Sequence, residues 1–339
     1  MPRAMRLLLV LAAMAGCGPM ITRTRVELPR GAAPPEGRYV EMHYLGNGGW
    51  VFRRGADVVA TAPFVTNPSG LGVYFFGNSD VERVTQRVPE MRDVRIMLIG
   101  HAHYDHAMDL PAVLRERAPN ARLYGSATVG HLFANAIEAP RLEVVDDPGE
   151  AAVGDVPGQW FPDDNAPVRF MPLTSNHAPH LCGVKLVSSE KLTKDLPHPP
   201  SIPACWPEGE TLAYLIDFLR PDGSVEFRIY YQDAAASPGM GGIPKKLPPS
   251  QQAPVDVAIL CVAGFAEVDD SPGWIVRNVE PRTILGGHWE DFFLCPSDKK
   301  PRVAPGTSLD DFITGAQEAH RVPVQIPALL DKVYFPLDR

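Results

Sequence analysis

The stretch Gly100-His101-Ala102-His103-Tyr104-Asp105-His106 holds three of the ten histidines of the chain within six positions. It follows directly on Val94–Ile99, a run that is apolar except for one arginine. A short continuous apolar run of this kind is typical of a buried strand. The polar stretch therefore stands at the point where a strand is expected to end.

The spacing of the polar residues in this stretch suits metal binding. His101 and His103 are two residues apart on an extended segment, so both side chains point the same way and can share one ion. Asp105 and His106 follow where the chain turns into a helix, and they can face a second ion beside the first. Neutral imidazole and carboxylate suit zinc, and also iron or manganese. The stretch therefore predicts a metal site.

Strand-like and helix-like segments interleave along the body of the chain. Strands are expected at residues 39–45, 50–53, 57–61, 94–99, 168–171, 183–187, 211–218, 225–231, 255–262 and 283–285. Helices are expected at residues 80–88, 109–117, 126–137 and 309–320. This interleaving predicts a layered α/β architecture. No composition break divides residues 38–339, so one catalytic domain is expected there.

The histidine-rich stretch resembles the His-x-His-x-Asp-His signature of the metallo-β-lactamase superfamily of binuclear metal hydrolases. The resemblance implies an α/β fold, the four-layer αβ/βα sandwich of that type, and three later ligands that each follow a strand. His177 follows the expected strand 168–171, Asp233 follows 225–231, and His288 follows 283–285. The order and spacing agree with the family from residue 38 to about residue 295.

Two of these matches leave alternatives open. His180 is a rival to His177, which is preferred because Gly183 follows six residues later and leads into a strand, as in ribonuclease-Z-like members. Gln232 stands before Asp233 where the family usually has glycine, and this departure concerns the loop conformation more than the ligand.

The resemblance implies two divalent metal ions, zinc in the first place, with manganese or iron as alternatives. His101, His103 and His177 would hold the first ion. The second would be held by Asp105, His106 and His288, and Asp233 would bridge the pair. A hydroxide between the ions forms near neutral pH, because coordination lowers the pKa of water from ~15.7 towards ~7. It would attack an ester, lactone or phosphodiester, and Asp105 would also orient it.

Within the superfamily, the motifs look most like two branches, N-acyl-phosphatidylethanolamine phospholipase D and ascorbate-6-phosphate lactonase-like proteins. The shared features are the histidine-rich stretch and His288-Trp289 with an aromatic residue, Phe292, shortly after it. The chain departs from them at Thr61-Ala62-Pro63-Phe64, where Thr-Asp-Pro is common. A small-molecule or lipid-like substrate is expected, with residues 188–207 shaping the mouth of the pocket.

The sequence is also compatible with functions other than a binuclear metal hydrolase of esters, lactones or phosphodiesters. A β-lactamase-type amide hydrolase is a second reading, but true metallo-β-lactamases replace the bridging carboxylate with cysteine or histidine, and Asp233 argues against it. A mono-iron sulfur oxygenase or a non-catalytic relative retains much of the same ligand set. Nucleic acid is not an expected partner, because the formal charge is −8 and no basic run is present.

The first 17 residues read as a secretion signal. Arg3 and Arg6 precede the apolar run 7–13, which is too short to span a bilayer as a helix. Met14-Ala15-Gly16 before Cys17 resembles a bacterial lipobox, with methionine where leucine is usual. The resemblance implies cleavage before Cys17 and its lipidation, so residues 18–37 would be a tether. The protein would be anchored in the cell envelope, facing the periplasm or the exterior. An ordinary cleaved signal is the alternative.

Four further cysteines follow Cys17. An oxidising compartment permits disulfides between them. Cys182 and Cys205 flank a proline-rich insertion and form the expected pair. Cys261 lies in an apolar run and is expected to be buried in a strand, and Cys295 is the fourth.

Overall fold

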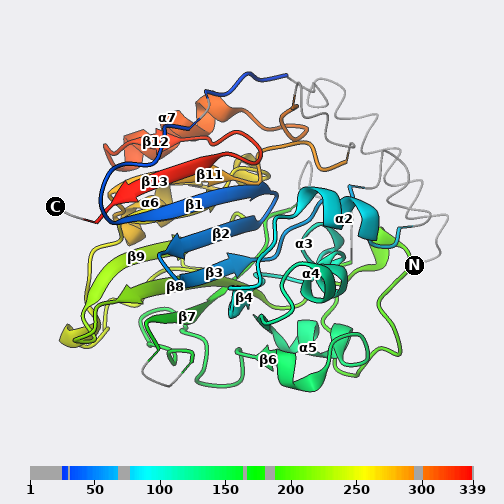
Figure 1. The fold of residues 1–339 in the computed structure, drawn as a ribbon. Coiled ribbons are helices and arrows are strands. Elements are labelled where there is room, and N and C mark those ends of the chain that lie inside the picture. The colour runs from blue at the N-terminus through cyan, green and yellow to red at the C-terminus, as the bar shows by residue number, and fades with distance from the viewer. Residues whose placement is uncertain are drawn as a thin grey trace.

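The structure is a computed structural model that describes residues 25–29, 31–67, 77–162, 166–179, 188–293 and 301–337. Among these residues, two sheets face each other (Figure 1). The first has the order β13-β1-β2-β3-β4-β5-β6, with bounds β1 Tyr39–Gly46, β2 Gly49–Arg54, β3 Asp57–Thr61, β4 Ile96–Leu98, β5 Arg122–Gly125, β6 Leu142–Val144 and β13 Lys332–Pro336. The second has the order β12-β11-β10-β9-β8-β7, with bounds β7 Val168–Ser175, β8 Thr211–Leu219, β9 Val225–Tyr231, β10 Val257–Cys261, β11 Thr283–Gly287 and β12 Val324–Gln325.

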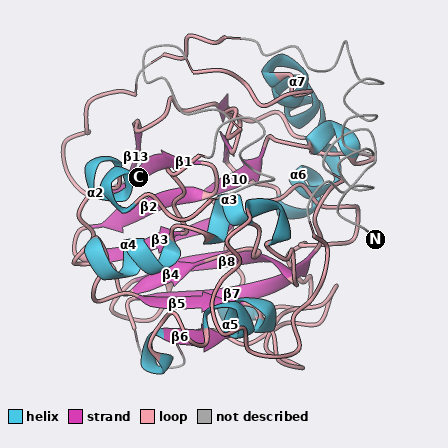
Figure 2. Ribbon diagram, turned by 90° about the vertical axis from the view of Figure 1, so that its right-hand side faces the viewer, coloured by secondary structure: helices cyan, strands magenta, loops and turns pink. Residues whose placement is uncertain are grey.

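Helices cover the outer face of each sheet (Figures 1 and 2). The α-helices are α2 Val81–Arg87, α3 Tyr104–Ala107, α4 Leu110–Glu116, α5 Ala127–Phe133, α6 Gly273–Val279 and α7 Leu309–Ala319. Four short 3-10 turns are also described, η3 Ala139–Arg141, η4 Pro203–Cys205, η5 Pro249–Gln251 and η6 Phe265–Glu267. Val113 of α4 and Leu132 of α5 share a buried cluster with Met97 of the first sheet. Ile275 of α6 and Phe312 of α7 share another with the second sheet. The arrangement confirms the four-layer αβ/βα sandwich expected from the sequence.

Most of the expected elements are present, and several are shorter than expected. The apolar run 94–99 forms β4 only over Ile96–Leu98, where it pairs in parallel with β3 and β5. Asp80 caps α2, because its side chain accepts a hydrogen bond from the Arg83 amide at 3.0 Å. The expected helix 126–137 ends at Phe133. The expected strand 183–187 lies outside the described residues.

Some elements were not expected from the sequence. β13 pairs antiparallel with β1 and closes one edge of the first sheet, yet its residues are only half-buried, so they lack the apolar alternation that marks a strand. β5, β6 and β12 have two to four residues each, too few for a periodic pattern. α6 follows Pro272 and contains β-branched residues, and its burial against α7 and the core outweighs that weak propensity.

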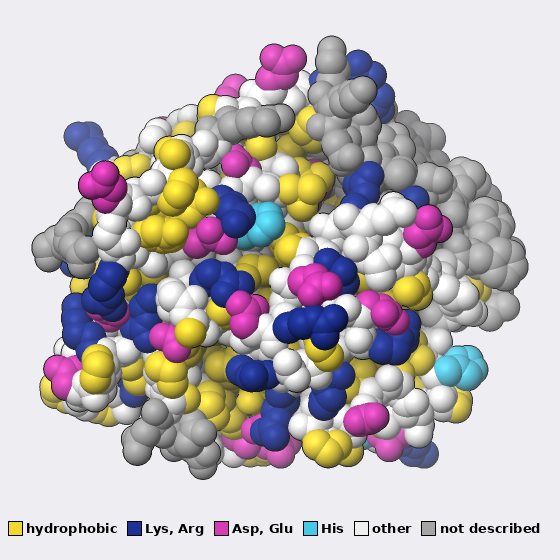
Figure 3. Space-filling view, viewed as in Figure 1, with side chains coloured by type: hydrophobic (Ala, Val, Ile, Leu, Met, Phe, Trp, Pro, Cys, Tyr) yellow, Lys and Arg dark blue, Asp and Glu magenta, His cyan; other side chains and the backbone are white. Residues whose placement is uncertain are grey.

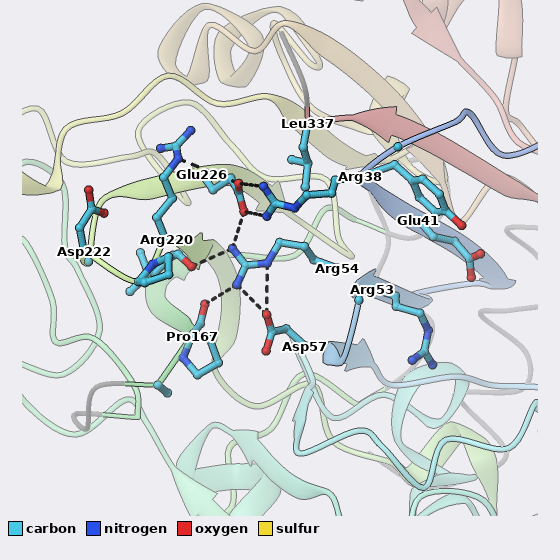
Figure 4. Close-up of a pocket in the computed structure, with 17 residues that line it drawn as sticks. Arg38, Glu41, Arg53, Arg54, Asp57, Pro167, Arg220, Asp222, Glu226 and Leu337 are labelled. Carbon is cyan, nitrogen blue, oxygen red and sulfur yellow. Dashed lines mark hydrogen bonds and ion pairs between the residues drawn. The ribbon is translucent and has the colours of Figure 1, made fainter.

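Arg54 lies at the end of β2 and contacts Glu226 near the start of β9, whereas the site residue Asp233 follows the end of β9, so Arg54 links the sheets at the end opposite to the histidine-rich stretch. Figure 4 shows these contacts. Arg54 is 8% exposed. Its guanidinium bonds to Glu226 of β9 at 2.9 Å, to Asp57 of β3 at 2.6 Å and to the carbonyl of Leu219 at 2.8 Å. These groups line a cavity of about 1130 Å³. The ion pair between Arg54 and Glu226 joins the two sheets, which indicates a structural role for Arg54.

Acidic and basic side chains are interspersed on the face shown in Figure 3. Partly exposed ion pairs include Arg53–Asp93 and Lys332–Glu41. Each such pair contributes about 0–1 kcal/mol, so the stability of the fold rests on its buried clusters.

The described cysteines do not support the expected disulfide. Cys205 is an exposed free thiol, and Cys261 is a buried free thiol at the end of β10. The expected Cys182–Cys205 bridge is therefore wrong for this structure, because nothing is bonded to the Cys205 sulfur. Cys182 and Cys295 lie outside the described residues, as does Cys17.

Candidate metal centre

The polar residues expected at the site all follow strands that end at one edge of the sandwich. The histidine-rich stretch comes after β4 and ends in α3, whose four residues are all buried. His177 comes two residues after β7, Asp233 two residues after β9, and His288 directly after β11. β9, β10 and β11 run parallel, so their carboxyl ends meet at the same edge.

His101, His103 and His177 form a first cluster of nitrogen ligands. One nitrogen of each lies within 4.8 Å of the others. His103 Nε2 lies 3.2 Å from the carbonyl of Ser188, and His177 Nδ1 lies 2.6 Å from the carbonyl of Ala178. A nitrogen facing a carbonyl must carry the proton, so each ring keeps a lone pair on its other nitrogen. The outer contacts therefore leave each of these two histidines one nitrogen that can hold a metal ion.

Asp105, His106 and His288 form a second cluster. His288 Nε2 lies 3.2 Å from Asp105 Oδ2, and His106 Nε2 lies 3.5 Å from the same oxygen. The two Nε2 atoms of His106 and His288 are 3.1 Å apart. All three ligand atoms therefore converge on one point.

Asp233 lies between the two clusters. Its Oδ1 is 3.2 Å from His101 Nδ1, and its Oδ2 is 3.4 Å from His106 Nδ1. The Gly100 amide donates a hydrogen bond to Oδ2 at 3.0 Å. A Cβ at Gly100 would lie 2.1 Å from Asp233 Oδ1, so only glycine fits there. Asp233 thus contacts one histidine of each cluster.

Burial sets the protonation of these groups. Burial, with the neighbouring His101, lowers the pKa of His106 to about 3, and burial also lowers the pKa of His177. Both rings are therefore neutral near pH 7. Burial by itself would raise the pKa of Asp105, but the neighbouring His106 and the hydrogen bond from His288 outweigh it and hold that pKa well below its usual range.

The remaining two groups shift upwards. Burial opposes the charged form of His288, yet its hydrogen bond to Asp105 outweighs burial and raises its pKa. Burial raises the pKa of Asp233. Within the second cluster, the contact with Asp105 thus favours the charged form of His288, whereas burial favours the neutral form of His106.

The donor set fits two divalent cations. Two imidazole nitrogens 3.1 Å apart can share at most one proton, whereas both can donate lone pairs to one cation. Imidazole nitrogen and carboxylate oxygen are the ligands that zinc, iron and manganese accept.

The structure brings together every described residue that the sequence singled out for the site: His101, His103, Asp105, His106, His177, Asp233 and His288. It supports the proximity of these residues, and their role as ligands stays a prediction. His180, the rival of His177, lies outside the described residues, as does Gly183, on which the preference for His177 rested.

Sequence reasoning missed the part of the site formed by the β1–β2 turn. Asn47 Nδ2 donates to the carbonyl of Asp105 at 3.3 Å. A Cβ at Gly48 would lie 2.6 Å from His106 Nδ1. The signal was present as Gly46-Asn47-Gly48-Gly49, because glycine is required where backbone closely approaches a functional group.

No protein-family model matches the sequence, and no curated protein does either. Solved structures do match. Igni18, a metallo hydrolase from the archaeon Ignicoccus hospitalis, matches with a TM-score of 0.50 and 14% identity, over 88% of this chain and 99% of that one. YhfI from Bacillus subtilis, a metallo-β-lactamase fold protein, matches with a TM-score of 0.49 and 13% identity, over 87% and 99%. The order of the two sheets and the match to Igni18 agree on the fold, a four-layer αβ/βα sandwich of the metallo-β-lactamase type.

The same fold also gives a match to CmlA, a diiron β-hydroxylase from Streptomyces venezuelae. The TM-score is 0.48 at 12% identity, over 90% of this chain and 55% of that one. At these identities, the likeness to all three proteins is one of fold. In this chain, the metallo-β-lactamase fold places the two clusters at the ends of β4, β7, β9 and β11.

Proposed function

We propose that the protein is a binuclear metal-dependent hydrolase. The observation that carries the proposal is the position of Asp233, whose two carboxylate oxygens lie 3.2 and 3.4 Å from a histidine of each cluster. A carboxylate between the two clusters lies where a group that bridges two cations is needed. His101, His103 and His177 would hold one ion, and Asp105, His106 and His288 the other.

Divalent cations held by these residues would supply hydroxide near neutral pH, because coordination lowers the pKa of water towards ~7. The chain contributes the orientation of the reactants. Asp105 stays anionic because its pKa is well below the usual range, and it can accept a hydrogen bond from the attacking oxygen. The buried neutral rings of His106 and His177 keep their lone pairs for ligation. The proposed substrate contains an ester, a lactone or a phosphodiester.

An apolar surface beside the second cluster supports a lipid-like or otherwise apolar substrate. The ring of Phe292 lies 4.9 Å from that of His288, and Phe293 lies 4.3 Å from Phe292. Both phenylalanines are only partly buried. An acyl or aromatic group of a substrate can pack on this surface while its reactive centre meets the two clusters.

The test is metal content by elemental analysis, together with turnover of bis(p-nitrophenyl) phosphate, a lactone and a β-lactam. We expect two zinc or manganese ions per chain and turnover of the first or second compound. In Asp233→Asn, metal affinity and turnover should both fall. The decrease should exceed the factor of about 10 to 100 that is typical of substitutions outside the ligand set. Asp269→Asn, the same change at an exposed position outside the two clusters, is the matched control. One iron per chain without hydrolysis would contradict the proposal and favour the oxygenase reading.

We also propose that lipid on Cys17 tethers the protein to a membrane of the cell envelope. Among the described helices, none is both long and apolar enough to cross a bilayer. Cys17 follows Met14-Ala15-Gly16, the arrangement that resembles a lipobox. Cys17→Ser should move the protein from the membrane fraction to the soluble fraction. Unchanged fractionation of the variant would argue against lipidation.

A further inference from the structure

Glu290 is a buried carboxylate beside the second cluster that the proposed ligand set does not use. It lies two residues after His288, is 6% exposed, and is held by an isolated antiparallel bridge to Val303. Its carboxylate accepts hydrogen bonds from the Tyr44 hydroxyl and from the Asn47 amide. Within the described ranges, no lysine or arginine forms an ion pair with it. Burying a carboxylate without a cation is costly, so the position needs positive charge nearby.

Tyr44 connects Glu290 to His288. The Tyr44 side chain is fully buried. Its hydroxyl donates a hydrogen bond to Glu290 and accepts one from the His288 amide at 2.8 Å. His288 has a φ of 52°, in the left-handed region that residues other than glycine rarely adopt. The hydrogen bond to Tyr44 therefore holds the backbone of this histidine in an uncommon conformation and directs its ring.

Asn47 connects Glu290 to Asp105 and His106. Its amide donates to Glu290, and its side chain donates to the carbonyl of Asp105 at 3.3 Å. The next residue of the turn, Gly48, packs against His106. One carboxylate thus anchors both a tyrosine and a turn that touch the second cluster. None of these contacts reaches His101, His103 or His177.

We propose that Glu290 is a positioning residue for the second metal site. Through Tyr44 it holds His288, and through Asn47 it holds the backbone of Asp105. Its negative charge also stabilises the cation bound between them. This inference rests on the metal binding in the proposed function, and it predicts that the two metal sites depend unequally on Glu290.

The test is a titration of the metal-free protein with Co²⁺ alone. Calorimetry and visible absorption monitor the binding of each ion. The wild-type protein should bind two ions, and His103→Gln identifies the step that belongs to the first cluster. Tyr44→Phe and Glu290→Gln should each weaken the binding of the ion at the second cluster about 10- to 100-fold, the usual effect of removing a partner that supports a metal ligand. The step of the first cluster should keep its wild-type affinity.

Tyr230→Phe is the matched control, because Tyr230 is equally buried and bonds through its hydroxyl to the carbonyl of Gly241. It should leave both binding steps unchanged. If Tyr44→Phe and Glu290→Gln weaken both binding steps equally, or leave both unchanged, this inference is overturned. The proposed function is not affected by that result. A wild-type protein that binds fewer than two ions overturns the proposed function and this inference with it. Glu290→Gln, which keeps the side-chain size, decides the matter if Tyr44→Phe fails to fold.

Discussion

At the scale of single residues, His106 combines two demands, since it must be buried and must stay unprotonated to bind metal. Burial and the neighbouring His101 lower its pKa from 6.5 to about 3. Between these values, the unfolded chain binds a proton at this histidine and the folded chain does not. His106 therefore destabilises the metal-free protein progressively as the pH falls from about 6.5 towards about 3.

This gives a prediction for the pH dependence of stability. Urea denaturation of the metal-free protein between pH 7 and pH 5 measures the free energy of unfolding. As the pH falls, His106→Gln should lose less of this free energy than the wild type does. The difference in slope is at most about 1.4 kcal/mol per pH unit, the value for one proton. The raised pKa of His288 acts in the opposite direction, so only comparison with the variant isolates His106. Parallel curves would contradict the prediction.

At the scale of elements, the β1–β2 turn is part of the site as well as a connection. A methyl group at Gly48 would lie 2.6 Å from His106 Nδ1 and 2.9 Å from the Tyr231 hydroxyl. The turn cannot move away freely, because Asn47 is bonded to Glu290 and to Asp105. Substitution in this turn should therefore disturb the metal site directly.

Gly48→Ala should weaken metal binding and lower the free energy of unfolding by about 1–3 kcal/mol, the usual cost of overpacking. Gly55→Ala is the control, at the β2–β3 turn where a new Cβ meets nothing within 4 Å. It has a φ of 59°, so alanine there costs about 1–2 kcal/mol of backbone strain without touching the site. Calorimetric metal titration separates the two variants. Equal metal affinity in both would contradict the role given to the turn.

The strands that carry the site were recognisable one by one, because most residues of each are apolar or aromatic and buried. β4, β7, β9 and β11 all fall within or overlap the expected segments, and each is followed by its expected ligand. The unexpected elements are short or half-buried, such as β13, whose pairing with β1 compensates for its weak pattern. Local pattern thus predicted the strands of the core better than those at the edges.

At the scale of the whole molecule, the two sheets are joined at both ends. The clusters join them at one end, and the ion pairs of Arg54 join them at the other. Arg54→Met would leave the buried Glu226 and the partly exposed Asp57 without this cation. The free energy of unfolding should fall by about 3 kcal/mol, the lower end for breaking a buried ion pair, because Arg38 still contacts Glu226.

Denaturation by urea checks this value, with Arg115→Ala as the control, since its pair with Glu116 is exposed. That pair should contribute less than about 1 kcal/mol. The metal content of folded Arg54→Met should equal that of the wild type, because the substitution lies at the end of the sandwich far from the clusters. Loss of metal with the fold retained would show that the two ends are coupled.

The sequence by itself determined the α/β class, the strands that lead to the site, and the residues of the two clusters. It could do so because the spacing within residues 101–106 is local, and because each later ligand stands within a few residues after a strand-like run. Only the tertiary structure decided that Asn47 and Glu290 support the same centre. They are 243 residues apart in the chain, and each is unremarkable among its neighbours in sequence. Their contact depends on how the two sheets pack, which no local pattern of residues records.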